Sequence, residues 1–263
     1  MAIIAATEGM NTPLSIDPEI EAMLDAGVHL GHVRSKRHSG MTPYLWGVRN
    51  NVEIIDLAKT KEKLHEALAF LRQVAAEKKL ILFVGTRPSA KDLIQRTAEA
   101  LGCPYVNRRW IGGTLTNFKV ILKRIETLEA LEQEKASGDF EKYPKKERMR
   151  KETDIIRLRE NFDGLRRLRK IPDAIVVMDI SHDAVALREA RRVKVPVIAL
   201  TDTNTDPRLV DYPIPANDDA QPAVAYLLGR MKSAVLEGRE AAETAPVTAA
   251  SSAPDNEKAP ANA

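Results

Sequence analysis

The chain has 263 residues, of which 44% are hydrophobic but only 5% aromatic, so aliphatic side chains have to supply most of its core. A single cysteine, Cys103, excludes a disulfide framework, and no apolar run approaches the roughly 20 residues that a membrane-spanning helix needs. The start of the chain lacks the basic and apolar regions of a secretory signal, so we expect a cytoplasmic protein without a membrane partner.

The net charge is only +3, but charges of one sign are clustered along the chain. Residues 26–52 contain four cations and no acid, residues 78–91 also contain four cations and no acid, and residues 100–125 contain five cations and no acid. Such clustering is typical of proteins that present a surface to nucleic acid.

The N-terminal region is expected to contain a β-hairpin. Residues 1–15 have a composition typical of a flexible extension. Further along, the apolar side chains of Tyr44, Trp46 and Val48 alternate toward Asn50 and Asn51. Because asparagine tolerates the left-handed conformation of tight hairpin turns, we expect the chain to reverse there.

Short apolar runs then alternate with amphipathic helical segments. Strands are expected at 52–57, 80–84, 104–107, 174–178, 195–200 and 212–214, and helices at 59–77, 89–101, 182–192 and 218–236. This alternation predicts an α/β fold, a doubly wound and mostly parallel sheet with helices on both faces. We assign this α/β domain to residues 16–117 and 171–238, and residues 239–263 to a disordered tail.

The sheet pattern is interrupted by residues 118–170. Apolar residues recur every three or four positions from Phe118 to Leu131 and again from Ile155 to Leu168, with a break around Gly138 and Pro144. This pattern predicts an inserted antiparallel coiled-coil hairpin of two helices. Residues 142–170 hold twelve cations and five acids, so the second helix is basic. Its charges are either a solvated helix face or an RNA-contacting surface, and the sequence leaves both open.

One loop, residues 107–119 with the sequence NRRWIGGTLTNFK, combines features that suit binding of a polyanion. Arg108 and Arg109 can pair with phosphates, and the glycines allow backbone N–H groups to approach them. Trp110 offers a ring on which a base can stack. The alternative is a tight turn with Trp110 folded into the core.

Polar residues at the ends of the predicted strands are candidates for a catalytic or metal site. The segment following the strand at 80–84 lacks the dinucleotide fingerprint and the Walker lysine, and Pro207 replaces the glycine that a calcium loop would need after Asp206. His29 and His32 are spaced like metal ligands but need a third ligand, for which Asp202 and Asp206 are candidates. We expect no catalytic residue, cofactor or metal. A sugar-phosphate or nucleotide enzyme and a coiled-coil adaptor remain the alternative classes.

The 107–119 segment and three further blocks, residues 26–32, 81–86 and 202–220, resemble the bacterial family of small-subunit ribosomal protein number two. The blocks occur in the order of that family and span about residues 22–238. The resemblance implies a structural, non-enzymatic constituent of the small ribosomal subunit. It further implies binding to ribosomal RNA and to neighbouring ribosomal proteins, including ribosomal protein number one, which acts in messenger RNA capture during translation.

The candidate RNA-binding residues come from the acid-free stretches and from the loop motif. They are Arg34, Lys36, Arg37, Arg49, Arg87, Arg108, Arg109, Trp110, Asn117, Lys119 and Lys123. The chain departs from the family pattern between Arg37 and Pro43, where a Trp-Asn-Pro-Lys-like element is common, so a contact at that segment is less well supported.

Overall fold

The computed structural model describes residues 17–244, so the predicted extension at 1–15 and residues 245–263 of the predicted tail lie outside the described residues. Its centre is a five-stranded sheet in the order β5-β4-β6-β7-β8, in which every neighbouring pair is parallel. The strands are β4 (Ile81–Val84), β5 (Tyr105–Val106), β6 (Ala174–Val177), β7 (Val197–Thr201) and β8 (Tyr212–Pro215). This confirms the mixed α/β class and the parallel sheet.

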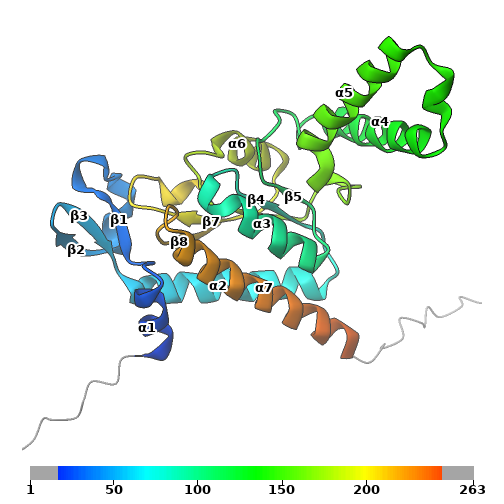
Figure 1. The fold of residues 1–263 in the computed structure, drawn as a ribbon. Coiled ribbons are helices and arrows are strands. Elements are labelled where there is room, and N and C mark those ends of the chain that lie inside the picture. The colour runs from blue at the N-terminus through cyan, green and yellow to red at the C-terminus, as the bar shows by residue number, and fades with distance from the viewer. Residues whose placement is uncertain (1–16, 245–263) are drawn as a thin grey trace, which may run out of the picture.

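Helices cover both faces of this sheet, and β4, β5, β6 and β7 each bury side chains on both sides (Figure 1). Phe83 faces one apolar cluster, together with α2 (Leu57–Ala76), α3 (Pro88–Leu101) and α7 (Gln221–Thr244). Its neighbours Leu82 and Val84 face the other cluster, together with α6 (Ala184–Val193). The alternation along a single strand therefore produces the two-sided winding that the sequence predicted.

A second, smaller sheet lies at one end of the molecule, next to the helix α1 (Pro18–Asp25) (Figure 1). It is antiparallel, in the order β1-β3-β2, and is formed by β1 (Leu30–Val33), β2 (Leu45–Arg49) and β3 (Val52–Ile55). The short 3-10 helices η1 (Arg34–Lys36) and η2 (Ser39–Tyr44) connect β1 to β2. Asn50 and Asn51 have φ values of 50° and 64°, which confirms the predicted hairpin turn.

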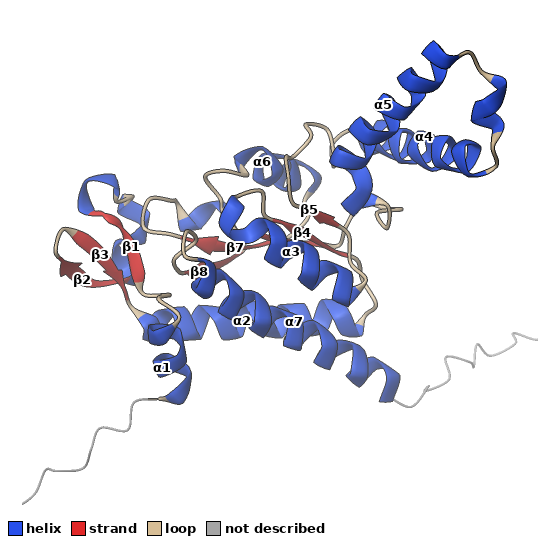
Figure 2. Cartoon of the chain, in the orientation of Figure 1, coloured by secondary structure: helices blue, strands red, loops and turns tan. Residues whose placement is uncertain are grey.

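The insertion consists of two helices that project from the sheet domain, α4 (Phe118–Ala136) and α5 (Lys145–Phe162) (Figure 2). The 3-10 helix η3 (Asp139–Lys142) joins them, and η4 (Asp163–Leu165) follows α5. Buried residues of both helices, such as Ile121 and Phe162, belong to the same apolar cluster as Leu82 and Val84 of β4. The base of the insertion is therefore continuous with the core of the sheet domain.

The boundary that the sequence placed after residue 238 is wrong. The 3-10 helix η5 (Pro207–Leu209) precedes β8, the last strand of the sheet. Helix α7 follows β8 and continues to Thr244. Gly238 is buried against the backbone of Arg72, and the Arg239 guanidinium donates to the carbonyl oxygen of Leu101 and to Cys103 Sγ. Composition suggested a tail because these contacts come from segments far away in the sequence.

Candidate functional site

The loop between β5 and α4 is built around a buried carboxylate from α6. Glu189 is only 8% exposed and accepts hydrogen bonds from the backbone N–H groups of Gly113 (2.7 Å), Leu115 (3.0 Å) and Thr116 (3.1 Å). It also accepts hydrogen bonds from the Thr116 hydroxyl and from the Trp110 indole, both at 3.1 Å. The backbone donors that we expected to approach an RNA phosphate are thus bonded to a carboxylate of the chain itself.

Those donors also determine the charge of Glu189. Burial alone would raise the pKa of its carboxyl group, but the backbone donors of Gly113 and Leu115 and the indole of Trp110 outweigh burial and hold the pKa below its usual value. Glu189 was not among the residues predicted from the sequence. A signal was present, because Glu189 lies three residues after Ala186 and four before Val193, on the apolar face of a helix that is otherwise rich in arginine.

Trp110 requires a correction. The ring is 7% exposed and packs in the cluster that contains Val106 and Leu115, so its face is not available to stack on a base. Glu189 supplies the acceptor that a buried indole N–H needs, which explains why the tryptophan is accommodated inside. The alternative that we kept for Trp110, a core residue beneath a tight turn, is the one the structure shows.

The two arginines before Trp110 point outward. Both are exposed; Arg108 forms an ion pair with Glu160 of α5 at 3.0 Å, and Arg109 has no ionic partner among residues 17–244. Asn117, Lys119 and Lys123 are also exposed, at and just after the start of α4. The structure therefore brings five of the predicted RNA-binding residues together on the loop and the adjoining helix.

A second group of predicted residues lies on the small sheet and the turn after β1. Arg34, Lys36, Arg37 and Arg49 are all exposed, and Arg37 lies 3.5 Å from the buried carboxylate of Glu53. In Figure 1 this sheet and the α4–α5 insertion are at opposite ends of the molecule. The candidate cations are thus spread over separate elements.

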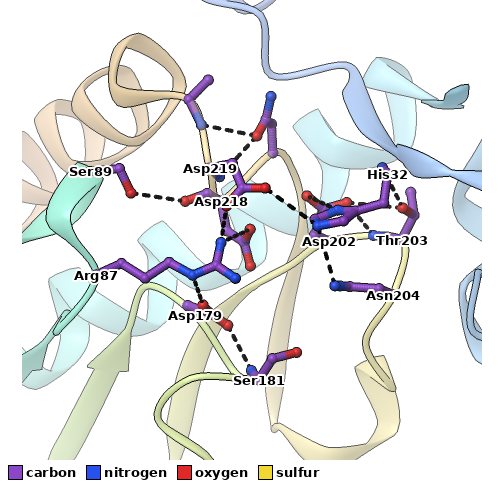
Figure 3. A network of polar contacts seen from close by, with 12 residues as sticks. His32, Arg87, Ser89, Asp179, Ser181, Asp202, Thr203, Asn204, Asp218 and Asp219 are labelled. Atoms are coloured by element: carbon purple, nitrogen blue, oxygen red, sulfur yellow. Dashed lines mark hydrogen bonds and ion pairs between the residues drawn. The ribbon is translucent and has the colours of Figure 1, made fainter. Parts of the chain in front are cut away.

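Arg87 belongs to neither group and requires the second correction (Figure 3). Its guanidinium forms ion pairs with Asp179, Asp218 and Asp219, and only 23% of the side chain is exposed. A guanidinium that already has three carboxylate partners is a poor ligand for RNA phosphate. The sequence did not reveal this because its acidic partners follow other strands of the sheet.

His32 links the small sheet to the same group of acids (Figure 3). Its Nδ1 lies 3.0 Å from Asp202 and its Nε2 lies 3.3 Å from Asp219. The hydrogen bond to Asp202 raises the pKa of His32 although burial opposes it. Each ring nitrogen of His32 thus faces a carboxylate, and the ligand atoms of His32, Asp202 and Asp219 lie within 4.8 Å of one another, so within residues 17–244 these three residues are the ones that could hold a metal. His29 is not part of this trio.

We call His32, Arg87, Asp179, Asp202, Asp218 and Asp219 the aspartate cluster. It lies where β4, β6, β7 and β8 end, the place where α/β folds commonly bind ligands. Burial, with the nearby carboxylates of Asp202 and Asp179, raises the pKa of Asp218 to about 8. Arg87 and His32 pair with the aspartates at these strand ends.

The structure also shows an exposed feature that the sequence analysis did not predict. Trp46 is 76% exposed and lines a groove of about 380 Å³ on the small sheet. Leu24, Leu30, Ile54 and Arg49 line the same groove. The alternation of Tyr44, Trp46 and Val48 indicated a strand, but not which of its faces the rest of the protein leaves uncovered.

Comparison with known proteins identifies the family. Residues 23–238 match the family model described as Ribosomal protein S2. The chain belongs to the ribosomal protein S2 family. It is 43% identical over 226 residues to the small ribosomal subunit protein uS2 from each of two strains of Thermus thermophilus, an alignment that covers 86% of this chain and 88% of each relative.

Membership of the ribosomal protein S2 family confirms the resemblance seen in the sequence. It makes the chain a structural constituent of the small ribosomal subunit that takes part in translation, and not an enzyme. The alternative of a sugar-phosphate or nucleotide enzyme is thereby overturned. Within residues 17–244, the helices are too short or too polar to cross a membrane.

Proposed function

We propose that this chain binds small-subunit ribosomal RNA, on cytoplasmic ribosomes, mainly through the loop that Glu189 anchors. The observation that supports this most directly is the outward display of Arg108 and Arg109 by a loop whose backbone is held from inside by one carboxylate. A loop that is ordered before binding loses less conformational entropy when it meets its ligand. Asn117, Lys119 and Lys123 extend the same surface along α4.

Two other basic regions would enlarge the contact. Helix α5 exposes Lys145, Lys146, Arg150 and Arg157, for which no ion pair is found among residues 17–244. The small sheet adds the exposed group around Arg34 and Arg49. Because each phosphate contact releases counterions, several separated contacts give an affinity that depends strongly on salt.

The test is the salt dependence of binding to small subunits that lack the endogenous protein. For the double variant Arg108→Ala/Arg109→Ala, we expect weaker binding and a log–log salt slope reduced by roughly 1.4 to 1.8 units, at about 0.7 to 0.9 for each phosphate contact. The matched control is Arg191→Ala/Arg192→Ala, which removes an equally adjacent and exposed pair from the end of α6. An unchanged slope for the Arg108/Arg109 variant would exclude this loop from the RNA interface.

We also propose that the chain helps to dock ribosomal protein number one for messenger RNA capture, and that the groove beside Trp46 is the docking surface. An exposed tryptophan, flanked by aliphatic side chains and one arginine, has the composition of a protein-binding hot spot. Trp46→Ala should weaken binding of purified ribosomal protein number one to small subunits about 30-fold or more, while leaving the occupancy of this chain unchanged. Equal binding of ribosomal protein number one by Trp46→Ala and wild-type subunits would rule the groove out.

For the insertion we propose a coiled-coil hairpin. Lys151 of α5 donates to Glu134 of α4 at 2.8 Å, and Lys135 lies 3.1 Å from Glu152. The Glu132 carboxylate accepts from Arg166 at 2.6 and 2.8 Å, an arrangement that lowers the pKa of Glu132 to about 2. These pairs, together with the apolar stripes of both helices, hold the hairpin in an antiparallel register.

A further inference from the structure

A polar cleft lies where the base of the insertion meets the edge of the parallel sheet. Its volume is about 240 Å³, and it is lined by the end of β5, the loop after β5, the end of α5 and η4. The Gly164 backbone packs directly against Tyr105, leaving no room for a side chain at that point. The close approach of η4 to β5 forms a fixed wall of the cleft.

Two amide side chains, those of Asn107 and Asn161, line this cleft. Asn107 donates its Nδ2 to the Gln95 side chain at 2.9 Å, and Asn161 donates its Nδ2 to the carbonyl oxygen of Arg157 at 2.8 Å. Both hydrogen bonds use the amide nitrogen, and no hydrogen bond within residues 17–244 uses either Oδ1 atom. The amide oxygens of Asn107 and Asn161 thus have no hydrogen-bond partner within residues 17–244, and acceptors of this kind suit the exocyclic amino group of a nucleobase.

Three arginines, Arg108, Arg109 and Arg159, and two acids, Glu160 and Asp163, also line the cleft. Arg159 is paired with Glu132 of α4, and Arg108 with Glu160 at 3.0 Å. The Arg108–Glu160 pair is about half exposed on both sides, and exposed pairs of this kind stabilise a protein little. A phosphate can therefore replace Glu160 as the partner of Arg108 at small cost, and Arg109, which has no ionic partner within residues 17–244, can bind or stack.

From this geometry we propose that the cleft binds one unpaired nucleotide of small-subunit ribosomal RNA. The base enters between Asn107 and Asn161, and its phosphate meets Arg108 and Arg109. RNA-binding proteins commonly recognise bases that are splayed out of the helix, through hydrogen bonds to the base edge and stacking on arginine. The polar lining disfavours an apolar protein segment, and the volume, slightly below the about 300 Å³ of the smallest typical ligand sites, limits the occupant to a single nucleotide. The inference rests on the proposed RNA-binding function and specifies a site within it.

The test uses the full-length protein and small subunits that lack it, with chemical probing of the ribosomal RNA at nucleotide resolution. Asn161→Phe fills the cleft without changing its charge, and Asn161→Ala removes only the amide. The matched control is Ile156→Phe, because Ile156 lies on the same helix, is 61% exposed and does not line the cleft. Thermal melting of each variant establishes that it folds.

We expect the wild-type protein and Ile156→Phe to protect the base edge of one nucleotide, and Asn161→Phe to leave that base reactive and to bind at least about 10-fold more weakly. The effect of Asn161→Ala should have the same direction but be smaller. Wild-type affinity and unchanged protection in Asn161→Phe would overturn the inference, and so would weaker binding without any base becoming reactive, which would indicate a backbone phosphate or a protein neighbour. If Arg108→Ala/Arg109→Ala also binds like the wild type, the proposed RNA-binding role of the loop fails as well.

Discussion

The carboxyl groups of Glu189 and Asp218 are buried beside the same parallel sheet, but the chain surrounds them with different kinds of partner. Glu189 receives hydrogen bonds from three backbone N–H groups, a hydroxyl and an indole. Asp218 shares one guanidinium, that of Arg87, with two other carboxylates. The pKa of Glu189 is lowered and that of Asp218 is raised, although burial acts in the same direction on both.

The difference shows what the two regions do for the molecule. Oriented backbone donors stabilise a charge without adding one of their own, so Glu189 can fix the shape of a loop whose outer surface stays basic. The aspartate cluster instead joins residues from several strand ends and from the small sheet, at the cost of carboxylate repulsion. The first arrangement orders a loop that displays cations, and the second connects the two sheets.

The largest expected effect is that of Glu189→Ala. It leaves the backbone donors of Gly113, Leu115 and Thr116 and the Trp110 indole without their acceptor, so we expect the free energy of unfolding to fall by about 4 kcal/mol. Urea denaturation measures this loss, with the exposed Glu126→Ala as control. A loss below about 1 kcal/mol would mean that water replaces the carboxylate and that the loop does not depend on it.

Arg87→Ala should be the next most destabilising change, at about 3 kcal/mol, because it leaves the buried Asp179 carboxylate without its cation and the Asp218 carboxyl group without a hydrogen-bond donor. Arg87→Lys keeps the charge but loses the planar fork that reaches several carboxylates, so about 1 kcal/mol is expected. Chemical denaturation of both variants, with the exposed Arg150→Ala as reference, ranks them. Equal stability of Arg87→Lys and Arg87→Ala would show that charge alone does not hold the cluster.

The smallest effect, and the most diagnostic, is a pH dependence. Asp218 has a folded-state pKa of about 8, far above the value near 3.9 expected in the unfolded chain. Between these two pH values the folded state therefore binds one more proton than the unfolded state. Because of this extra proton, the free energy of unfolding falls as pH rises through that window. His32, with its raised pKa, contributes stability that is also lost as pH rises above about 6.5. Asp218→Asn should flatten the loss between pH 6 and 8 by about 2 kcal/mol.

Glu189 has the opposite effect on stability, in the acidic part of the pH range. Because its pKa is lowered, its contribution is present above the unfolded-state value and is lost as pH falls below about 4.5. Denaturation midpoints of the wild type, Asp218→Asn and the exposed control Asp92→Asn, measured from pH 3 to 9, separate the two effects. If Asp218→Asn and the wild type have the same slope between pH 6 and 8, the proton that we assign to Asp218 resides elsewhere.

Much of the architecture follows from local features of the sequence. A strand or an amphipathic helix can be recognised from residues within one or two turns of each other, so the alternating runs predicted the parallel sheet and its two layers of helices. Asn50 and Asn51 predicted the hairpin turn because their conformational tolerance is a property of the residues themselves. The loop motif and the three further blocks that resemble the ribosomal family likewise indicated that family from residues that are contiguous in the chain.

Only the tertiary structure decided which of these residues are available at the surface. The Trp110 indole donates a hydrogen bond to Glu189, which lies 79 residues away in the sequence. The Arg87 guanidinium donates to Asp218, which lies 131 residues away. The other tryptophan, Trp46, was expected only as part of a strand and is the more exposed of the two. Burial and charge pairing depend on which distant segments meet, so local composition can identify a basic and aromatic loop but not the side of it that faces the core.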